Sequence, residues 1–192
     1  MAQLYFRYGA MGSSKTANAL MVRHNYIERG KTVLMLKPRT DTRDGENIIK
    51  SRIGLKCECE IIDDYITKES YIVTNKAVDT DVVIVDEAQF LSNHQVDWLS
   101  NLVDFNHIPV ICYGLRTDFQ GKLFEGSKRL LEVADKIEEI KTICWCGRKA
   151  TFNARLANGQ ITTDGEKIQL GGNESYISLC RQHYKLKQLG GE

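Results

Sequence analysis

The sequence has no long hydrophobic run and no excess of charge of either sign. Its apolar segments are too short to cross a bilayer, and the first residues already have the pattern of a strand, so we expect neither a membrane span nor a signal peptide. The chain has 26 Lys and Arg against 25 Asp and Glu, so it has no large excess of positive charge that would attract nucleic acid or an anionic membrane. Internal repeats and low-complexity segments are also absent. These absences predict a globular, cytoplasmic protein with no nucleic-acid or membrane partner.

Length and cysteine content further limit the class of protein to which this chain can belong. The 192 residues suffice for one domain with a small appendage, and a hydrophobic content of 42% can supply its core. In a reducing compartment, six cysteines favour free thiols or metal ligands over disulfides. Cys112 lies in an apolar stretch and is expected in the core, whereas Cys57 and Cys59 alternate with charged residues, as in a partly exposed strand.

The first motif with chemical meaning follows an apolar stretch and leads into a helical pattern. It reads Gly9-Ala10-Met11-Gly12-Ser13-Ser14-Lys15-Thr16. In a phosphate-binding loop, backbone N–H groups converge on phosphates at a helix N-terminus, a lysine reaches the terminal phosphates and a hydroxyl holds Mg²⁺. Lys15 and Thr16 would have the last two roles. The usual pattern has glycine where this chain has Ser14, so the backbone there must accept a Cβ atom.

A second motif is the apolar run 82–85, which ends in Asp86 and Glu87. Consecutive β-branched residues predict a strand buried on both faces of a parallel sheet, and ligands of α/β proteins bind at the carboxyl ends of such strands. With the loop, this predicts an α/β fold with a P-loop NTPase-type parallel sheet flanked by helices, Asp86 being associated with Mg²⁺. Glu87 is placed to accept a proton on the substrate side. The alternative to a nucleotide site is that residues 9–16 form a turn rich in glycine and serine and that residues 82–85 form an unrelated core strand.

Hydrophobic periodicity predicts alternating strands and helices over residues 1–143. We expect strands at 4–8, 32–36, 57–62, 71–74, 82–86, 109–115 and 136–143, and helices at 16–29, near Tyr65, at 94–105 and at 124–133. The charged segment 39–52 is expected to be a mobile loop, and 116–121 a loop at the ligand edge of the sheet. After Ile143 the sequence changes to short segments and glycine-rich turns. Residues 144–192 are therefore predicted to form a separate small subdomain with a frayed tail from Lys185.

Cys144 and Cys146, together with Cys180 and His183, have the arrangement of a structural zinc ribbon. In such a site four protein ligands occupy all the tetrahedral positions around the metal. The metal then stabilises the fold of the subdomain and has no catalytic role. The first pair is C-x-C rather than the commoner C-x₂-C, a spacing that strains a chelate on one ion. Two alternatives are free cysteines with His183 in an exposed tail, and a pairing of the two earlier strand cysteines with Cys144 and Cys146.

Five separated motifs resemble, in order, those of type II thymidine kinases over nearly the whole chain. They are residues 9–16, 41–43, 86–90, 113–119, and 170–176 followed by Cys180. The resemblance implies transfer of the γ-phosphoryl group of ATP to the 5′-hydroxyl of thymidine, which gives thymidine monophosphate. It also implies a homotetramer and feedback inhibition by thymidine triphosphate.

The resemblance also implies roles for individual residues. The phosphates would be bound by Gly9, Ala10, Met11, Gly12, Ser13, Ser14, Lys15, Thr16 and Arg43. Glu87 would be the general base, and Thr16, Asp86 and Asp41 would hold Mg²⁺. Thymidine would be bound by Met11, Phe90, Leu115, Phe119, Phe124, Gln169, Leu170, Gly171, Gly172 and Tyr176. Residues 169–176 would form a lasso that closes over the base and is anchored by the zinc ribbon, with Tyr176 reaching the sugar. For Phe124, ordinary core packing is an equal alternative.

Two other function classes fit part of this pattern. Asp-Glu after an apolar strand is also the arrangement of a P-loop ATPase or helicase-like motor. Such a motor needs a surface for nucleic acid or a moving partner, and the neutral charge balance and small size of the chain argue against it. A zinc-ribbon binding module regulated by nucleotide is the non-enzymatic alternative, in which Glu87 would be dispensable.

Overall fold

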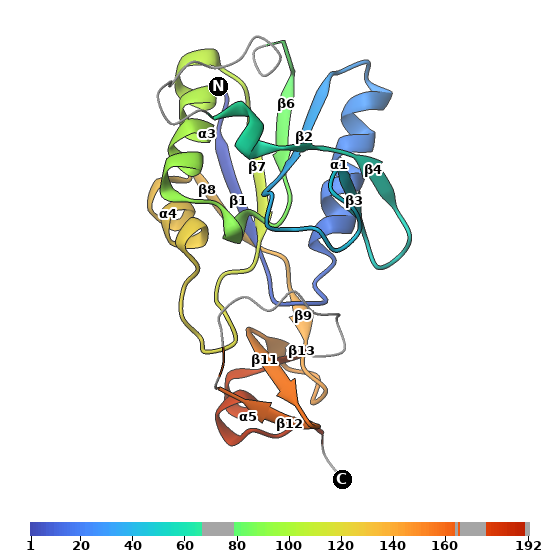
Figure 1. Ribbon diagram of the computed structural model, residues 1–192, viewed down its shortest axis with the longest axis vertical. Helices are drawn as coiled ribbons and strands as arrows, with labels where there is room; N and C mark the ends of the chain where they lie inside the picture. The colour runs from blue at the N-terminus through green and yellow to red at the C-terminus, as the bar shows by residue number, and fades with distance from the viewer. Residues whose placement is uncertain (67–78, 164, 166–175, 191–192) are drawn as a thin grey trace.

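The main sheet lies in the upper part of the molecule in Figure 1. The computed structural model describes residues 1–66, 79–163, 165 and 176–190. The sheet has six strands in the order β5-β2-β6-β7-β1-β8, and every pairing is parallel. These strands are β1 Leu4–Tyr8, β2 Val33–Lys37, β5 Glu60–Ile61, β6 Val82–Val85, β7 Val110–Gly114 and β8 Lys136–Glu139. The parallel sheet flanked by helices is therefore confirmed.

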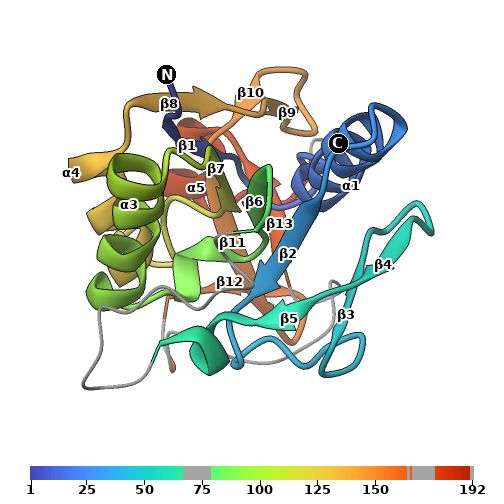
Figure 2. The same cartoon turned by 90° about the horizontal axis from the view of Figure 1, so that it is seen from above.

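Helices cover both faces of this sheet, as Figure 2 shows from above. Helix α1, Lys15–Glu28, lies on one face, and α3, Asn93–Asn106, and α4, Glu125–Val133, lie on the other. The sheet has a hydrophobic core on each face, and the side chains of β6 alternate between these two cores. Val83 and Val85 pack in the cluster that contains α3 and α4 residues, and Val82 and Ile84 pack in the cluster that contains α1 residues. β6 is fully buried, as the apolar run predicts.

Local sequence explains how α3 begins and which face it buries. The Ser92 hydroxyl accepts from the Gln95 N–H, and the Gln95 side chain accepts from the Ser92 N–H, which together form a capping box. Four apolar residues of the helix recur at helical spacing and are buried. They are Val96, Leu99, Leu102 and Val103, the stripe that periodicity predicts; Trp98 is buried too, whereas Phe105 is exposed.

Segment 39–52 differs from the expected mobile loop. It contains β3, Ile48–Lys50, which pairs antiparallel with β4, Lys56–Glu58. Ile49 is buried in the α1-side core, and the fully buried ammonium of Lys37 donates to the carbonyls of Gly45, at 2.7 Å, and Ile48, at 2.9 Å. A buried cation that satisfies two carbonyls fixes the base of this β3–β4 hairpin to the sheet.

Two expected strands are each divided, because their halves join different sheets. The strand expected at 57–62 is divided between β4 and β5, and the one expected at 136–143 is divided into β8 and β9, Thr142–Ile143. The turn of helix near Tyr65 is a 3₁₀ helix, η1 Ile62–Tyr65, and Cys112 is fully buried as expected. The strand expected at 71–74 lies outside the described residues.

A second unit lies below the main sheet in Figure 1. β9 pairs with β10, Lys149–Ala150, and a three-stranded sheet has the order β12-β11-β13. The remaining elements are β11 Phe152–Ala157, β12 Gln160–Thr162, β13 Tyr176–Leu179 and α5 Arg181–Leu186, so α5 includes the first residues of the expected tail. Ala154, Ile161 and Leu179 form its small core. No helix in the described part of the chain is long and apolar enough to cross a membrane.

Candidate functional site

The carboxyl ends of β1, β6 and β7 border one cavity with a volume of about 990 Å³. Its lining includes Met11, Gly12, Ser14, Lys15, Thr16, Asp41, Arg43, Arg52, Asp86, Glu87, Phe90, Leu115, Phe119, Phe124, Asn153 and Tyr176. Most residues of the expected site thus come together at one edge of the sheet. Gly9, Ala10 and Ser13 belong to the same loop but do not line the cavity. Gln169, Leu170, Gly171 and Gly172 lie outside the described residues.

The loop between β1 and α1 is held by its own lysine. The ammonium of Lys15 donates to the carbonyls of Gly9, at 3.2 Å, and Ala10, at 3.0 Å, and to the hydroxyl of Ser13, at 3.4 Å. Ser14, which precedes α1, is left-handed with φ 62°. Burial lowers the pKa of Lys15 to about 8, although the carboxylates of Glu87 and Asp86 act in the opposite direction. The loop thus accepts the Cβ atom of Ser14, at the cost of a conformation that glycine adopts more readily.

The two carboxylates after β6 have opposite electrostatic environments. Asp86 is 4% exposed, and its burial, followed by the charge of Glu87, raises its pKa to about 7, while a hydrogen bond from the Thr16 hydroxyl opposes the rise. Burial also acts against the charge of Glu87. The ion pair with Arg43 and the hydrogen bond from Gln89 outweigh it, so the pKa of Glu87 lies below its ordinary value. Around neutral pH Glu87 is therefore ionised, while Asp86 titrates.

Arg43 contacts two acidic residues of the site, Asp41 and Glu87. Its Nε donates to Asp41 Oδ1 at 2.7 Å, and its terminal nitrogen donates to Glu87. Asp41 also faces the Lys37 ammonium at 3.9 Å. The segment that follows β2 is thereby joined to the end of β6 across the floor of the cavity.

Gln89 is a buried residue that orients Glu87. It is 1% exposed, its amide nitrogen donates to Glu87, and its amide oxygen accepts from the Leu115 N–H at 2.9 Å. A Cβ atom at Gly114 would lie 2.9 Å from that amide oxygen, so the close approach of β7 requires glycine. In the sequence, Gln89 is marked only as part of the family motif 86–90. A polar residue two positions after Glu87 was the available signal.

The apolar wall of the cavity is built from aromatic rings. Phe90 and Phe124 meet edge to face, with centroids 5.7 Å apart. Phe124 is half-buried and is absent from the core clusters, which favours cavity lining over core packing. The Arg155 guanidinium lies 3.8 Å from the centroid of the Phe119 ring and donates to the Tyr176 hydroxyl at 2.9 and 2.7 Å. Arg155 therefore contacts both aromatic residues, the ring of Phe119 and the hydroxyl of Tyr176.

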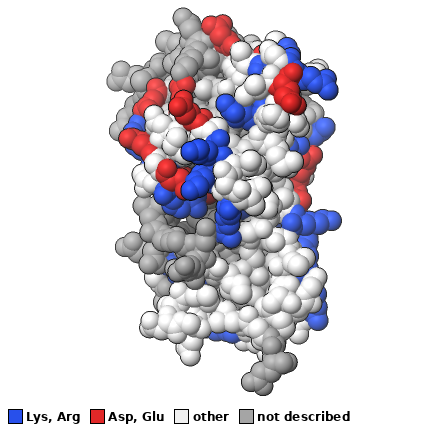
Figure 3. Space-filling model, turned by 90° about the vertical axis from the view of Figure 1, so that its right-hand side faces the viewer, with Lys and Arg blue, Asp and Glu red and all other residues white. Residues whose placement is uncertain are grey.

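Arg52 and Asn153 are among the lining residues that the sequence motifs do not mark. Arg52, in the turn of the β3–β4 hairpin, has a guanidinium nitrogen 3.9 Å from where a Cβ atom on Gly12 would lie. Asn153, on β11, reaches the cavity from the small sheet. Neither belongs to a recognisable local motif, because each approaches the phosphate loop through tertiary structure. Figure 3 views the side of the α1 helix and this hairpin, where basic and acidic side chains lie close together rather than in a patch of one sign.

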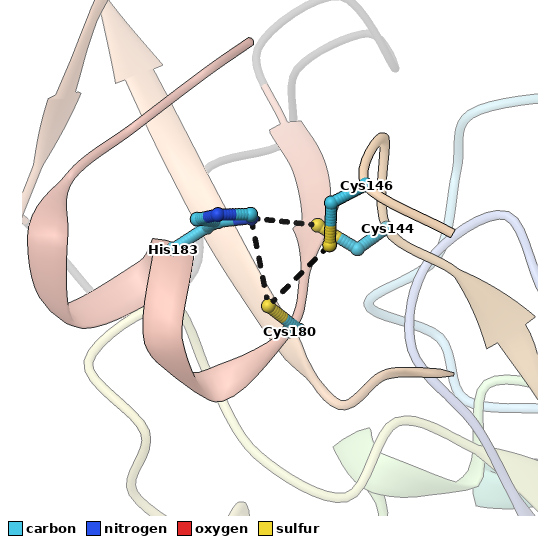
Figure 4. Close-up of side chains that lie close together, drawn as sticks. All are labelled: Cys144, Cys146, Cys180 and His183. Atoms are coloured by element: carbon cyan, nitrogen blue, oxygen red, sulfur yellow. Dashed lines mark hydrogen bonds between the residues drawn. The ribbon is translucent and has the colours of Figure 1, made fainter. Parts of the chain in front are cut away.

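The cysteine and histidine cluster forms a second centre, shown in Figure 4. The ligand atoms of Cys144, Cys146, Cys180 and His183 all lie within 4.8 Å of one another. Cys146 and Cys180 Sγ are 4.0 Å apart, and His183 Nδ1 is 3.4 Å from Cys144 Sγ and 3.5 Å from Cys180 Sγ. Tetrahedral zinc with Zn–S of about 2.3 Å requires sulfur atoms about 3.8 Å apart. The cluster thus fits zinc.

The C-x-C pair enters this cluster through a tight turn. The Gly147 N–H donates to the Cys144 carbonyl at 2.9 Å, and Gly147 has φ 80°, which a side chain would disfavour. Both thiols then face the same point, so this spacing does not prevent a common ligand set. In the described part of the chain, the alternative grouping with Cys57 and Cys59 is not formed.

A family model and several known proteins match all or part of this chain. The family described as "Thymidine kinase" matches residues 2–184. Curated thymidine kinases are 52% identical in Lactiplantibacillus plantarum over 96% of each chain, and 50% identical in Streptococcus gordonii over 96% of each chain. That of Lactococcus lactis is 49% identical over 96% of this chain and 97% of its own. A solved replication initiator DnaA bound to AMPPCP and single-stranded DNA has a TM-score of 0.47 and 20% identity, over 73% of this chain and 41% of that chain.

Proposed function

This chain belongs to the thymidine kinase family, and from that premise we propose that it transfers the γ-phosphoryl group of ATP to the 5′-hydroxyl of thymidine. One observation carries the proposal: the phosphate loop, the Asp86-Glu87 pair and the aromatic wall all face a single cavity. Its volume of about 990 Å³ is at the upper end of ligand pockets. That leaves room for a nucleoside beside the phosphates of a nucleotide.

At the phosphate end, the loop from Gly9 to Thr16 would cradle the triphosphate with backbone N–H groups. Lys15 would exchange its contacts with loop carbonyls for the terminal phosphates, and Arg43 would face the transferred group. Arg52 would add a further cation above Gly12. Thr16, Asp86 and Asp41 would hold Mg²⁺, which when bound neutralises charge on the phosphates.

At the reacting centre, Glu87 would take the proton of the thymidine 5′-hydroxyl. The freed oxygen then forms a bond to the γ-phosphorus, the bond from that phosphorus to the β,γ-bridging oxygen breaks, and ADP leaves. The proton on Glu87 passes to water after the product departs. Because Arg43 and Gln89 keep Glu87 ionised, it is ready to accept a proton at neutral pH.

The aromatic wall would receive the thymine base. Met11, Phe90, Leu115, Phe119 and Phe124 supply apolar surface, and the Tyr176 hydroxyl, held by Arg155, would face the sugar. Residues 169–176 would close over the base as a lasso. We propose the boundary between the P-loop domain, 1–143, and the zinc and lasso subdomain, 144–192, because the chain leaves the main sheet after β8, four residues before it.

The test is ATP consumption with and without thymidine, for the native protein and for Glu87→Gln. Thymidine-dependent turnover is expected, and Glu87→Gln should lower it by about 10²-fold or more, while ATP and thymidine still bind, because only the proton acceptor is lost. Glu132→Gln is the control, since this exposed carboxylate on α4 pairs only with Arg129 at 3.2 Å among its described partners. Turnover independent of thymidine would instead support a motor, and no turnover with bound zinc would support a binding module.

Two parts of the proposal, the homotetramer and feedback inhibition by thymidine triphosphate, come from the family resemblance alone. A third, the cytoplasmic location, is an expectation from the sequence. Light scattering on the purified protein tests the first, inhibition of turnover by thymidine triphosphate tests the second, and cell fractionation tests the third.

A further inference from the structure

We propose that Asn153 and Ser178 are positioning residues that fix the Met11 peptide, so that the small C-terminal sheet sets the shape of the phosphate loop. The inference rests on the proposed function, because Met11 belongs to the loop that would bind ATP and also lines the base side of the cavity. It concerns side chains on β11 and β13 that no motif identifies.

The contacts form a two-sided clamp on one residue. Asn153 and Ser178 are directly opposite each other in the β11–β13 pair, so their side chains lie on the same face of the small sheet. Asn153 Oδ1 accepts from the Met11 N–H at 2.7 Å, and the Ser178 hydroxyl donates to the Met11 carbonyl. One cross-strand pair therefore satisfies both backbone polar groups of Met11.

Asn153 also connects the phosphate loop to the aromatic wall. Its amide nitrogen donates to the Thr117 carbonyl at 3.3 Å, two residues before Phe119. A single side chain thus joins the loop after β1 to the loop after β7. This arrangement fixes the amide orientation, because only the oxygen can accept from an N–H and only the nitrogen can donate to a carbonyl.

Burial makes this link costly to remove. Asn153 is 4% exposed, so an apolar replacement would leave the Met11 N–H and the Thr117 carbonyl without their partner in a buried place. Met11 is next to Ala10, whose carbonyl holds the Lys15 ammonium at 3.0 Å, and next to Gly12, which has φ 75°. A shift of the Met11 peptide would therefore displace both the lysine contact and the left-handed turn.

The expected consequence is loss of alignment rather than loss of chemistry. Displacement of reacting groups by about 1 Å can lower turnover by about 10²-fold even when every catalytic group is present. Ser178→Ala removes one hydrogen bond and should weaken ATP binding by about tenfold. Asn153→Leu removes two and should have the larger effect, and Ser178→Thr, which keeps the hydroxyl, should restore native behaviour.

The experiment combines hydrogen–deuterium exchange with ATP binding on the full-length, metal-loaded chain. In Ser178→Ala and Asn153→Leu, peptides that cover residues 9–16 should exchange faster than in the native protein, with unchanged zinc content. Gln160→Ala, an exposed position on β12 of the same sheet, is the control and should match the native protein. If Asn153→Leu fails to fold, Ser178→Ala and Ser178→Thr still decide the matter.

Two outcomes overturn the inference: native exchange over residues 9–16 in Ser178→Ala together with native ATP affinity, or a Ser178→Thr variant that behaves like Ser178→Ala. Neither outcome depends on thymidine turnover. A protein without kinase activity in which the clamp still governs exchange would refute the proposed function and leave the clamp standing.

Discussion

Arg43 forms an ion pair with Glu87 across the floor of the cavity, although the two residues are far apart in the sequence. This pair, rather than exposure to water, keeps the glutamate charged, because burial alone would favour its neutral form. The same guanidinium also binds Asp41, so the loop after β2 controls the proton acceptor at the end of β6.

Removing Arg43 should move the acid limb of the pH–rate profile. Since Arg43 lowers the pKa of Glu87, Arg43→Ala should raise that pKa, and the acid limb of kcat should shift to higher pH. The measurement is kcat against pH at saturating ATP and thymidine. Arg39→Ala is the control, because Arg39 pairs with Glu46 and Asp64 outside the cavity. An unmoved acid limb in Arg43→Ala would mean that another group sets it.

The pH dependence of kcat/KM for ATP should be bell-shaped. Asp86 must lose its proton to hold Mg²⁺, and burial raises its pKa to about 7, so activity should fall as the pH drops below about 7. Lys15 must keep its proton to attract phosphate, and burial lowers its pKa to about 8, so activity should fall again above about 8. Steady-state rates at low ATP, from about pH 5.5 to about pH 9.5, measure both limbs. A flat profile over this range would contradict the assignment of these two groups.

Ser14→Gly should stabilise the protein slightly. The left-handed conformation costs a non-glycine residue about 1 kcal/mol, and the greater freedom of glycine in the unfolded chain returns about half of that. We expect a gain of about 0.5 kcal/mol in unfolding free energy, measured by urea denaturation. Ser100→Gly, in the interior of α3, is the opposite control and should lose about 0.5 kcal/mol. Equal losses in both variants would show that the Ser14 side chain stabilises the loop.

Metal removal should affect the C-terminal unit first. The purified chain should contain about one zinc ion, and Cys180→Ser should lose it, because the serine hydroxyl is a poor substitute for thiolate. Limited proteolysis should then cut within residues 144–192 before the main sheet, and the KM for thymidine should rise. Cys57→Ser, outside the cluster, should keep its metal. Absence of zinc from the native protein would end the assignment.

The sequence predicts elements well where one physical signal dominates. The run 82–85 has no polar position, so its burial on both faces follows from composition alone, and the stripe of α3 follows from helical spacing. The β3–β4 hairpin is not predicted, because charged residues conceal it and the buried ammonium of Lys37 holds it in place. Tertiary contacts override local composition there.

The same distinction applies to the candidate site. Lys15, Thr16, Asp86 and Glu87 lie in continuous motifs whose spacing carries their meaning, and all of them line the cavity. Asn153 lines it, and Arg155 contacts its lining residues Phe119 and Tyr176, from a sheet that is distant in sequence, so no local pattern marks them. Burial of polar side chains is the property that distinguishes them, and burial becomes visible only in the folded chain.

The Met11 clamp has a consequence for recombination between related enzymes. Segments near the two ends of the chain share one set of hydrogen bonds, and these bonds go to the backbone of residue 11, which a loop from another parent also supplies. Functional chimeras are therefore expected when the segment that contains β11 and β13 keeps Asn153 and Ser178, whichever parent supplies the phosphate loop.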